Sequence, residues 1–205
     1  MRARGVHQVI VATDDSRIQE AATGFGAHVE MTSAAHPSGT DRCAEVAKKH
    51  PETTHFINVQ GDEPLIDPKL ISRLARHLAA EPGLEMITAA TPFSEDEPVE
   101  NPNAVKVVLN RFKDALYFSR SPMPFVRDTG KRAGYLRHLG IYGYSRTFLL
   151  RFVRWKPGTL ETLECLEQLR ALENGTKIRV LETQSASIGV DTPSDAVLAE
   201  KLLKK

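Results

Sequence analysis

The sequence predicts an α/β fold: a doubly wound, mostly parallel sheet with a smaller antiparallel part. Over residues 9–90, apolar runs of strand length alternate with segments whose apolar residues recur at helical spacing. This alternation is typical of parallel strands joined by right-handed crossovers. After Pro92, two short apolar runs are separated by a short turn, which is typical of an antiparallel pair. The length suits a single domain over residues 1–205.

Capping and turn residues divide the first part into its elements. Ser38 opens a helix, and Asp67 followed by Pro68 is an N-cap with proline at the first helical position. Gly24 ends the helical pattern that begins at Ser16. The expected elements are strands at 9–13, 28–31, 55–59 and 86–90, and helices at 16–23, 38–50 and 68–80.

The second part is less regular. Residues 122–134 contain prolines, glycines and charges without periodicity, so we expect a mobile loop over a site or an interface. Ser145 can cap a helix, and Asn174-Gly175 is a favoured stop for a longer one. The expected elements are strands at 105–109, 115–119, 138–144 and 178–181, and helices at 145–153, 159–174 and from 192 onward. In the last helix, three apolar residues are expected to pack inward: Val197, Leu198 and Leu202.

Composition argues against several classes of protein. Lys plus Arg (27) nearly balances Asp plus Glu (26), so nothing indicates a nucleic-acid-binding surface or a polybasic membrane surface. No apolar run approaches the roughly 20 residues needed to span a bilayer. The two cysteines, Cys43 and Cys165, each fall within a predicted helix, which argues against a disulfide framework or a zinc site. We therefore expect a soluble cytoplasmic protein with no nucleic-acid and no membrane partner.

Residues 58–64 are the most informative segment. They end an apolar run with a glutamine, a glycine and two carboxylates, and ligands of open parallel sheets bind just beyond the carboxyl ends of such strands. Asp62 would lie at that edge, where a carboxylate suits a Mg²⁺ ion that holds phosphates. Asp191, in the segment 189–193, has the same local setting, so the two aspartates could share one or two Mg²⁺ ions. The alternatives are a plain turn at Asp62 and a helix N-cap at Asp191.

Five further polar residues could contribute to a site, although each also has an ordinary structural explanation. His138 and Tyr142 share one face of a strand, where a histidine is more often only a hydrogen-bond partner. Glu167 and Gln168 fall in the middle of a predicted helix, where they would ordinarily be solvated. Arg120 follows a strand and could bind a carboxylate with its planar guanidinium or cap a strand edge.

Two charged features give further expectations. Lys106 lies in a valine-rich strand and is expected to be an edge lysine. Asp14-Asp15 follows the first strand, where nucleotide-binding sheets usually place a phosphate loop, and two anions there would repel a triphosphate. Either the fold binds no nucleotide or the chain begins one strand and one helix late.

Several blocks along the chain form a recognisable ordered set. They are residues 11–14, 36–42 (HPSGTDR), 58–64 (NVQGDEP), 101–108 (NPNAVKVV), 115–120, 137–144, 160–161 with 166–170, and 189–193. In this order they closely resemble the 3-deoxy-manno-octulosonate cytidylyltransferases, the CMP-Kdo synthetases of Gram-negative bacteria. The resemblance covers nearly the whole chain.

The resemblance implies transfer of a cytidylyl group from CTP to the anomeric hydroxyl of the sugar acid Kdo, with release of pyrophosphate, for lipopolysaccharide biosynthesis. By position, Ser38, Gly39 and Gln60 would bind the nucleotide at its cytosine. Asp62 and Asp191 would be catalytic and would hold Mg²⁺. The residues implied in binding Kdo are Arg120, His138, Tyr142, Glu167 and Gln168. A homodimer is also implied, through an inserted sugar-binding and dimerisation lobe at about residues 92–155.

One part of the family pattern has no counterpart in the sequence. The family begins with a strand and an arginine- and lysine-containing loop that wraps the CTP phosphates, whereas Met1-Arg2-Ala3-Arg4 looks like the end of the helix after that loop. We therefore expect the chain to lack that strand and loop. Two alternatives follow: a cytidylyltransferase for a related sugar acid, such as sialic acid or the 8-amino analogue of Kdo, and a dimerising or Kdo-binding remnant without transferase activity.

Overall fold

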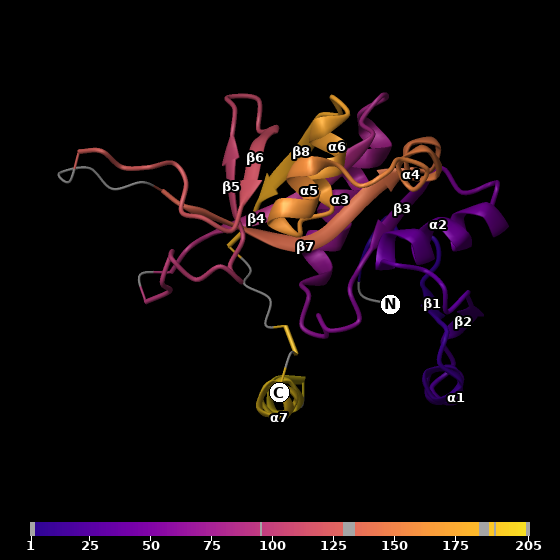
Figure 1. Ribbon diagram of the computed structural model, residues 1–205. Helices are drawn as coiled ribbons and strands as arrows, with labels where there is room; N and C mark the ends of the chain where they lie inside the picture. Colours follow the sequence, from indigo (N-terminus) through magenta and orange to yellow (C-terminus); the bar gives the residue numbers. More distant parts are fainter. Residues whose placement is uncertain (1–2, 95, 129–133, 185–188, 191, 204–205) are drawn as a thin grey trace.

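The computed structural model describes residues 3–94, 96–128, 134–184, 189–190 and 192–203 (Figure 1). The strands are β1 (Ile10–Thr13), β2 (His28–Met31), β3 (His55–Asn58), β4 (Met86–Pro92), β5 (Lys106–Leu109), β6 (Ala115–Ser119), β7 (Leu136–Ser145) and β8 (Ile178–Glu182). The helices are α1 (Ser16–Gly24), α2 (Gly39–Lys49), α3 (Pro68–Ala80), α4 (Arg146–Phe152), α5 (Thr159–Glu164), α6 (Gln168–Glu173) and α7 (Pro193–Leu203). All eight predicted strands are present, with bounds within two residues of those expected.

Six of the strands form one sheet around β7. The strand order is β6-β5-β7-β4-β8, and β3 pairs with β7 beside β5. β7 runs antiparallel to β3, β4 and β5, while β4 and β8 are parallel. β3, β4, β5 and β8 therefore point the same way, and the predicted α/β fold with a mostly parallel strand direction is confirmed. The antiparallel β5–β6 pair is also confirmed, and β1 and β2 form a separate parallel pair (Figure 1).

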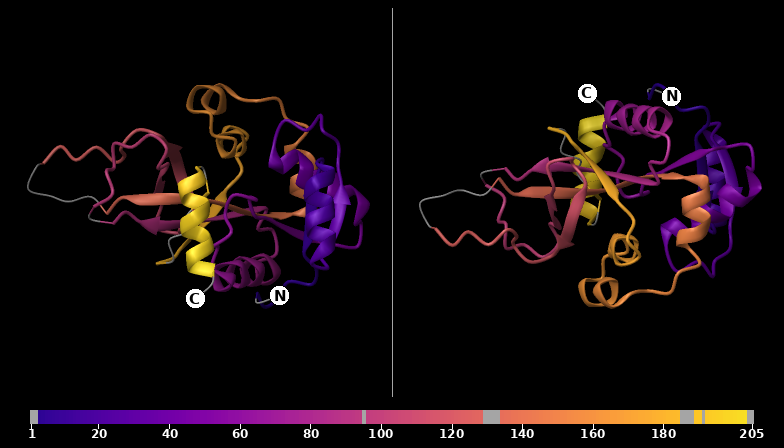
Figure 2. Two further views of the ribbon diagram at one scale, coloured as in Figure 1. Left: turned by 90° about the horizontal axis from the view of Figure 1, so that it is seen from below. Right: turned by 90° about the horizontal axis from the view of Figure 1, so that it is seen from above.

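Side chains on the two faces of this sheet fill two separate cores. In β4, Met86 and Ala90 belong to the core that includes residues of α2, α4 and α6. Ile87 and Ala89 belong to the core formed with α3. Figure 2 shows α3 on one side of the sheet and α5 and α6 on the other. Because successive β4 side chains point to opposite faces of the sheet, helices pack against both faces.

The turn of the β5–β6 hairpin is fixed to β8, at the other end of the strand order. Arg179 of β8 donates from Nε to Asp114 Oδ1 and from Nη1 to Glu81 Oε2, both at 2.8 Å. Asp114 lies just before β6 and Glu81 follows α3, so one guanidinium joins three elements. The range 92–155, predicted as an inserted lobe, contributes this hairpin and also β7, which is central to the main sheet.

The prediction of one continuous helix over residues 159–174 is wrong, because two short helices occupy this range. α5 ends at Glu164 because Cys165 adopts the left-handed conformation, with φ 50°, and α6 begins only at Gln168. Cys165 is therefore exposed at a helix end and does not lie inside a helix. Cys43 does lie in α2, where burial raises the pKa of its thiol to about 12.

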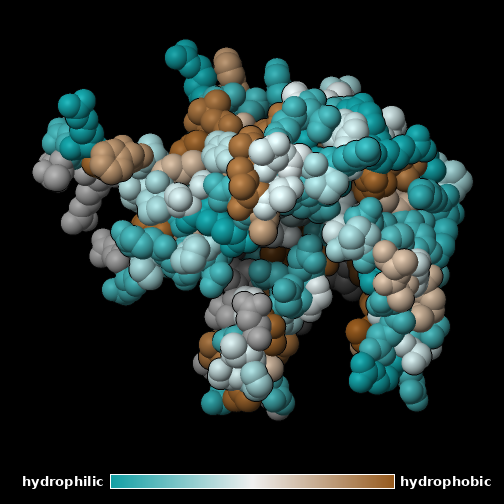
Figure 3. Space-filling model, in the orientation of Figure 1, coloured by the Kyte–Doolittle hydropathy of each residue, from teal (hydrophilic) through white to brown (hydrophobic). Residues whose placement is uncertain are grey.

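The predicted packing of α7 is also wrong. Val197, Leu198 and Leu202 are 52%, 44% and 39% exposed, and Ala199 is the buried residue of the helix. The reason is position: α7 lies apart from the sheet, and its apolar side chains are visible at the surface (Figures 1 and 3). Within the described ranges, no helix is long and apolar enough to cross a membrane.

Substitution of Gly143 in β7 tests the packing between the sheet and α3. A Cβ at this position would lie 2.7 Å from both Ile87 Cγ2 and Leu78 Cδ1. We expect Gly143→Ala to lower the free energy of unfolding by about 1–3 kcal/mol, because overpacking forces neighbouring atoms to shift. Urea unfolding followed by circular dichroism measures the change.

The matched control is Gly140→Ala on the same strand. An added Cβ there would have no neighbouring atom of the described residues within 4 Å, so the free energy of unfolding should change by less than about 0.5 kcal/mol. Equal losses in the two variants would show that close packing at Gly143 is not the cause.

Candidate functional site

The carboxyl end of β3 and the first turn of α2 meet at one edge of the sheet. β3 ends at Asn58, which pairs with Tyr142 of β7. The turn that follows brings Gln60 close to α2, since a Cβ at Gly39 would lie only 3.3 Å from Gln60 Oε1. The glycine thus lets the backbone of α2 approach the Gln60 amide. Ser38, Gly39 and Gln60, the three residues predicted to bind a nucleotide, therefore lie together.

The same turn of α2 also contacts the residue before α6. Ser38 caps α2 and accepts a hydrogen bond from Asp41 N at 3.2 Å. Its hydroxyl lies 2.7 Å from Asp41 Oδ2 and 2.9 Å from Glu167 Oε1. The Thr40 hydroxyl donates to Glu167 Oε2 at 2.6 Å. A residue predicted for the nucleotide and a residue predicted for the sugar acid are therefore in direct contact.

The break between α5 and α6 determines where Glu167 and Gln168 lie. Glu167 is half-buried against α2. Gln168 is 4% exposed, and its Nε2 has no hydrogen-bond partner within the described part of the chain. An unpaired buried donor is unfavourable, and a ligand that accepts its hydrogen bond would remove that cost. The alternative of two solvated residues in mid-helix is wrong, because the helix is interrupted just before them.

A buried ion pair lies behind Glu167. Arg170, 8% exposed, donates from Nε to Glu161 Oε2 at 2.7 Å and from Nη2 to the other oxygen of the same carboxylate. The hydrogen bond to Glu161 raises the pKa of Arg170. The guanidinium carbon also lies 4.8 Å from the centre of the Phe152 ring, and Nη2 lies 3.7 Å from Glu167 Oε1. A fixed positive charge thus stands beside the Glu167 carboxylate.

His138 is a neutral hydrogen-bonding group held by Thr88. Its Nε2 lies 2.9 Å from Thr88 Oγ1, and the Thr88 hydroxyl also lies 2.7 Å from Ile141 O and 3.2 Å from Leu139 O. Since a carbonyl can only accept, we infer that the single hydroxyl proton of Thr88 is donated to a carbonyl. Thr88 then accepts from His138, which places the ring proton on Nε2 and leaves Nδ1 as an acceptor. Desolvation by the surrounding protein lowers the pKa of His138 to about 3, so the ring is uncharged at neutral pH.

Tyr142 lies beside this histidine. The two ring centres are 5.3 Å apart, which confirms that the two residues share a face of the strand. Desolvation, together with the negative charge of Glu167, raises the pKa of Tyr142 well above its ordinary value. The phenol therefore stays protonated and can donate a hydrogen bond.

Arg120 joins two loops to the end of α5. Its guanidinium donates from Nε to Glu164 O at 2.7 Å, from Nη1 to Pro102 O at 2.9 Å and from Nη2 to Cys165 O at 3.2 Å. A cation at the carboxyl end of a helix is favourable. Among the described residues, three of the five guanidinium N–H groups have acceptors, and the other two could serve a ligand.

Lys106 is not an edge lysine, so that prediction is wrong. β5 lies between β6 and β7, and the side chain is 0% exposed. Its three protons are donated to Asn101 O at 3.0 Å, Ala104 O at 2.9 Å and Arg120 O at 2.5 Å. Desolvation lowers the pKa of Lys106. The ammonium group thus fixes the backbone at Arg120, a role whose only sequence signal is a lysine among the inward positions of an apolar strand.

The predicted metal ligands are Asp62 and Asp191. Asp62 is exposed in the turn after β3, and its carboxylate contacts no partner among the described residues. Its carbonyl accepts from Val190 N at 2.8 Å, so the chain immediately before Asp191 lies next to it. Asp191 itself lies outside the described residues, and within them no three His, Cys, Asp or Glu side chains are grouped to hold a metal. An open carboxylate suits Mg²⁺, so Asp62 fits as one ligand.

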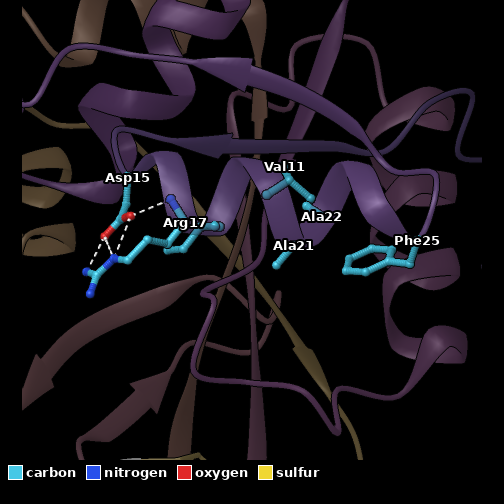
Figure 4. A pocket seen from close by; sticks show the side chains of 7 residues that line it. Val11, Asp15, Arg17, Ala21, Ala22 and Phe25 are labelled. Carbon is cyan, nitrogen blue, oxygen red and sulfur yellow. Dashed lines mark hydrogen bonds and ion pairs between the residues drawn. The ribbon is translucent and has the colours of Figure 1, made fainter.

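The two aspartates after β1 are paired with arginines. Asp15 caps α1 and binds Arg17, whose guanidinium lowers the pKa of that carboxyl to about 2 (Figure 4). Asp14 Oδ1 lies 3.1 Å from Arg42 Nη2. Neighbouring cations therefore offset the repulsion predicted for a triphosphate. The open pocket beside Asp15, about 450 Å³ in volume, is lined mainly by apolar residues and by none of the predicted site residues.

Comparisons with known proteins agree on one family. The cytidylyltransferase family matches residues 2–178. The 3-deoxy-manno-octulosonate cytidylyltransferase of Geobacter metallireducens is 51% identical over 93% of this chain and 78% of that protein, and the one of Syntrophotalea carbinolica is 47% identical over 99% and 84%.

Solved structures agree with this match. A CMP:2-keto-3-deoxy-manno-octonic acid synthetase complexed with CTP has a TM-score of 0.92 and 42% identity, covering 98% of this chain and 83% of that chain. A 4-diphosphocytidyl-2C-methyl-D-erythritol synthase from Anaerococcus prevotii, 12% identical with a TM-score of 0.62 over 98% of this chain and 83% of that chain, shares the fold alone. With matches of this extent and identity, the chain belongs to the cytidylyltransferase family.

Proposed function

We propose that the protein transfers CMP from CTP to the anomeric hydroxyl of Kdo, giving CMP-Kdo and pyrophosphate for lipopolysaccharide biosynthesis. The observation that carries the proposal is the contact between Ser38, on the proposed nucleotide side, and Glu167, on the proposed sugar-acid side. Two substrates that react must lie side by side. The names of the relatives support Kdo as the acceptor substrate, and the complex of the related synthetase with CTP supports CTP as the donor.

On the nucleotide side, Ser38, Gly39 and Gln60 would bind the base. The Gln60 amide offers both a donor and an acceptor, which suits the edge of cytosine. Because Gly39 has no side chain, this amide can lie directly against the first turn of α2.

On the sugar-acid side, the available groups have complementary hydrogen-bonding character. Tyr142 would donate, His138 would accept at Nδ1, and Gln168 would donate from its unpaired Nε2. Glu167 would accept from sugar hydroxyls, and Arg120 would offer its two remaining N–H groups to an anionic oxygen. These groups suit an acceptor that carries several hydroxyls and one carboxylate.

The reaction joins two anions, so charge has to be neutralised. The anomeric oxygen forms a bond to the α-phosphorus, the bond from that phosphorus to the pyrophosphate oxygen breaks, and the hydroxyl proton passes to solvent. Bound Mg²⁺ would supply charge neutralisation and alignment of the substrates. Asp62 and Asp191 would hold it, and no protein nucleophile takes part.

A cytoplasmic homodimer is the form that we propose for the enzyme. Residues 92–155 would serve as the sugar-binding and dimerisation lobe. Large apolar side chains are exposed on its hairpin and the loop that follows: Phe112 (69%), Leu116 (61%) and Phe125 (87%). Large apolar side chains exposed on a hairpin and the loop after it suit contact with a second protomer.

Pyrophosphate release from CTP and Mg²⁺, with and without Kdo, tests the proposed function. We expect release that depends on Kdo. Sialic acid and the 8-amino analogue of Kdo are assayed at the same concentration. Faster release with either analogue would favour the related-acceptor alternative, and binding of Kdo without any release would favour the non-catalytic alternative.

Asp62→Asn tests the metal-binding role. We expect turnover to fall by at least about a hundredfold, because the change removes a charge that would hold Mg²⁺ and keeps the shape of the side chain. Pyrophosphate release measures turnover, and thermal unfolding should be unchanged.

The control for this variant is Glu52→Gln, which removes one carboxylate charge at a position 70% exposed. Its turnover should match that of the unmodified protein. A folding defect in Asp62→Asn would instead support the plain-turn interpretation of Asp62.

Gly39→Ala tests the approach of α2 to Gln60. The added Cβ at 3.3 Å from Gln60 Oε1 should displace the amide. We expect the KM for CTP to rise roughly three- to tenfold, the cost of disturbing about one hydrogen bond. The control is Gly24→Ala, whose added Cβ would have no atom of the described part of the chain within 4 Å, and this change should leave the KM for CTP unaltered. Equal effects of the two changes would contradict the contact between Gly39 and Gln60.

A further inference from the structure

Thr40 holds the contact between the two proposed substrate sides, although it belongs to neither set of predicted residues. It lies in the first turn of α2 and is 2% exposed. Its hydroxyl donates to Glu167 Oε2 at 2.6 Å, across 127 residues of sequence. A hydrogen bond to a charged acceptor is among the stronger ones, and burial shields it from water.

The Ser38 hydroxyl cannot hold Glu167 in the same way. It has one proton, and two carboxylates compete for it: Asp41 Oδ2 at 2.7 Å and Glu167 Oε1 at 2.9 Å. A nucleotide that accepts a hydrogen bond from Ser38 would compete with both carboxylates for the same proton. The Thr40 hydroxyl also has a hydrogen-bond contact with the Tyr144 phenol, which stays protonated because burial raises its pKa and which can therefore donate to Thr40. The half-buried serine can change its partner, whereas the proton of the buried threonine is left for Glu167.

The Glu167 carboxylate has acceptor positions to spare. An ionised carboxylate offers about four lone-pair positions, and Ser38 and Thr40 occupy one on each oxygen. Arg170 Nη2 at 3.7 Å adds positive charge without taking a close hydrogen bond. The remaining positions are suited to hydroxyl groups, and the unpaired Nε2 of the adjacent Gln168 supplies a donor beside them.

We propose that Thr40 is a positioning residue for the sugar acid. Its hydroxyl orients the Glu167 carboxylate towards the acceptor hydroxyls and keeps that orientation while Ser38 engages the nucleotide. The inference rests on the proposed function, and it gives the first turn of α2 a part in both substrate sites.

A pair of variants separates the hydroxyl from the shape of the side chain. Thr40→Val keeps the shape and removes the hydroxyl, whereas Thr40→Ser keeps the hydroxyl and removes a methyl group. Steady-state pyrophosphate release gives kcat and both KM values. For Thr40→Val we expect the KM for Kdo to rise about tenfold, which corresponds to the loss of one charge-assisted hydrogen bond. The KM for CTP should stay within about twofold of its value in the unmodified protein. For Thr40→Ser we expect both KM values within about threefold of the unmodified protein.

A double-variant cycle tests the route through Glu167. In a Glu167→Ala background, adding Thr40→Val should change the KM for Kdo by less than about twofold, because the acceptor of the bond is already gone. Thermal unfolding checks that each variant is folded, and Thr40→Ala is the second variant if Thr40→Val is not.

Two results would overturn the inference: equal impairment of Thr40→Ser and Thr40→Val, or equal rises of the two KM values in Thr40→Val. Absence of Kdo-dependent release by the unmodified protein would instead overturn the proposed function. In that case calorimetry measures Kdo binding by the same variants, and an unchanged affinity in Thr40→Val would overturn the inference by itself.

Discussion

The pairing of β7 along both edges is the constraint on which the rest of the structure depends. β4 lies along one edge, and β5 and β3 share the other. A slip of one residue in this register would move every side chain of the strand to the opposite face. His138 and Tyr142 would then leave the side of the sheet where Glu167 lies. Gly143 helps to fix the register, because a side chain at its position would meet Leu78 of α3 and Ile87 of β4.

The polar side chains of the site already have their positions and protonation states set by neighbouring protein groups. Lys106 and Arg120 are bound by backbone carbonyls, and Arg170 is bound by a carboxylate. His138 is neutral and Tyr142 is protonated, because both are desolvated. Groups fixed in this way need little rearrangement when a ligand arrives, which favours binding and catalysis by an organised site.

Local signals predicted most elements, because caps and apolar runs act over a few residues. Ser38 and Ser145 cap helices as expected. Short-range signals could not predict that Cys165 would end α5, since a non-glycine residue adopts that conformation only in a suitable tertiary context. The buried ammonium of Lys106 likewise depends on carbonyls contributed by separate segments. Strand ends indicated Asp62 as a candidate, while the substrate roles came from family resemblance.

The hydrogen bond from Thr40 to Glu167 also has an evolutionary consequence. It joins positions 127 residues apart, and it can orient the Glu167 carboxylate only while both side chains are present. A hydroxyl lost from α2 would leave an oxygen of the half-buried Glu167 carboxylate without its donor, and a carboxylate lost before α6 would leave the buried Thr40 hydroxyl without its acceptor. Among descendants of this gene, a residue without a hydroxyl at position 40 should therefore be found only together with a change at position 167.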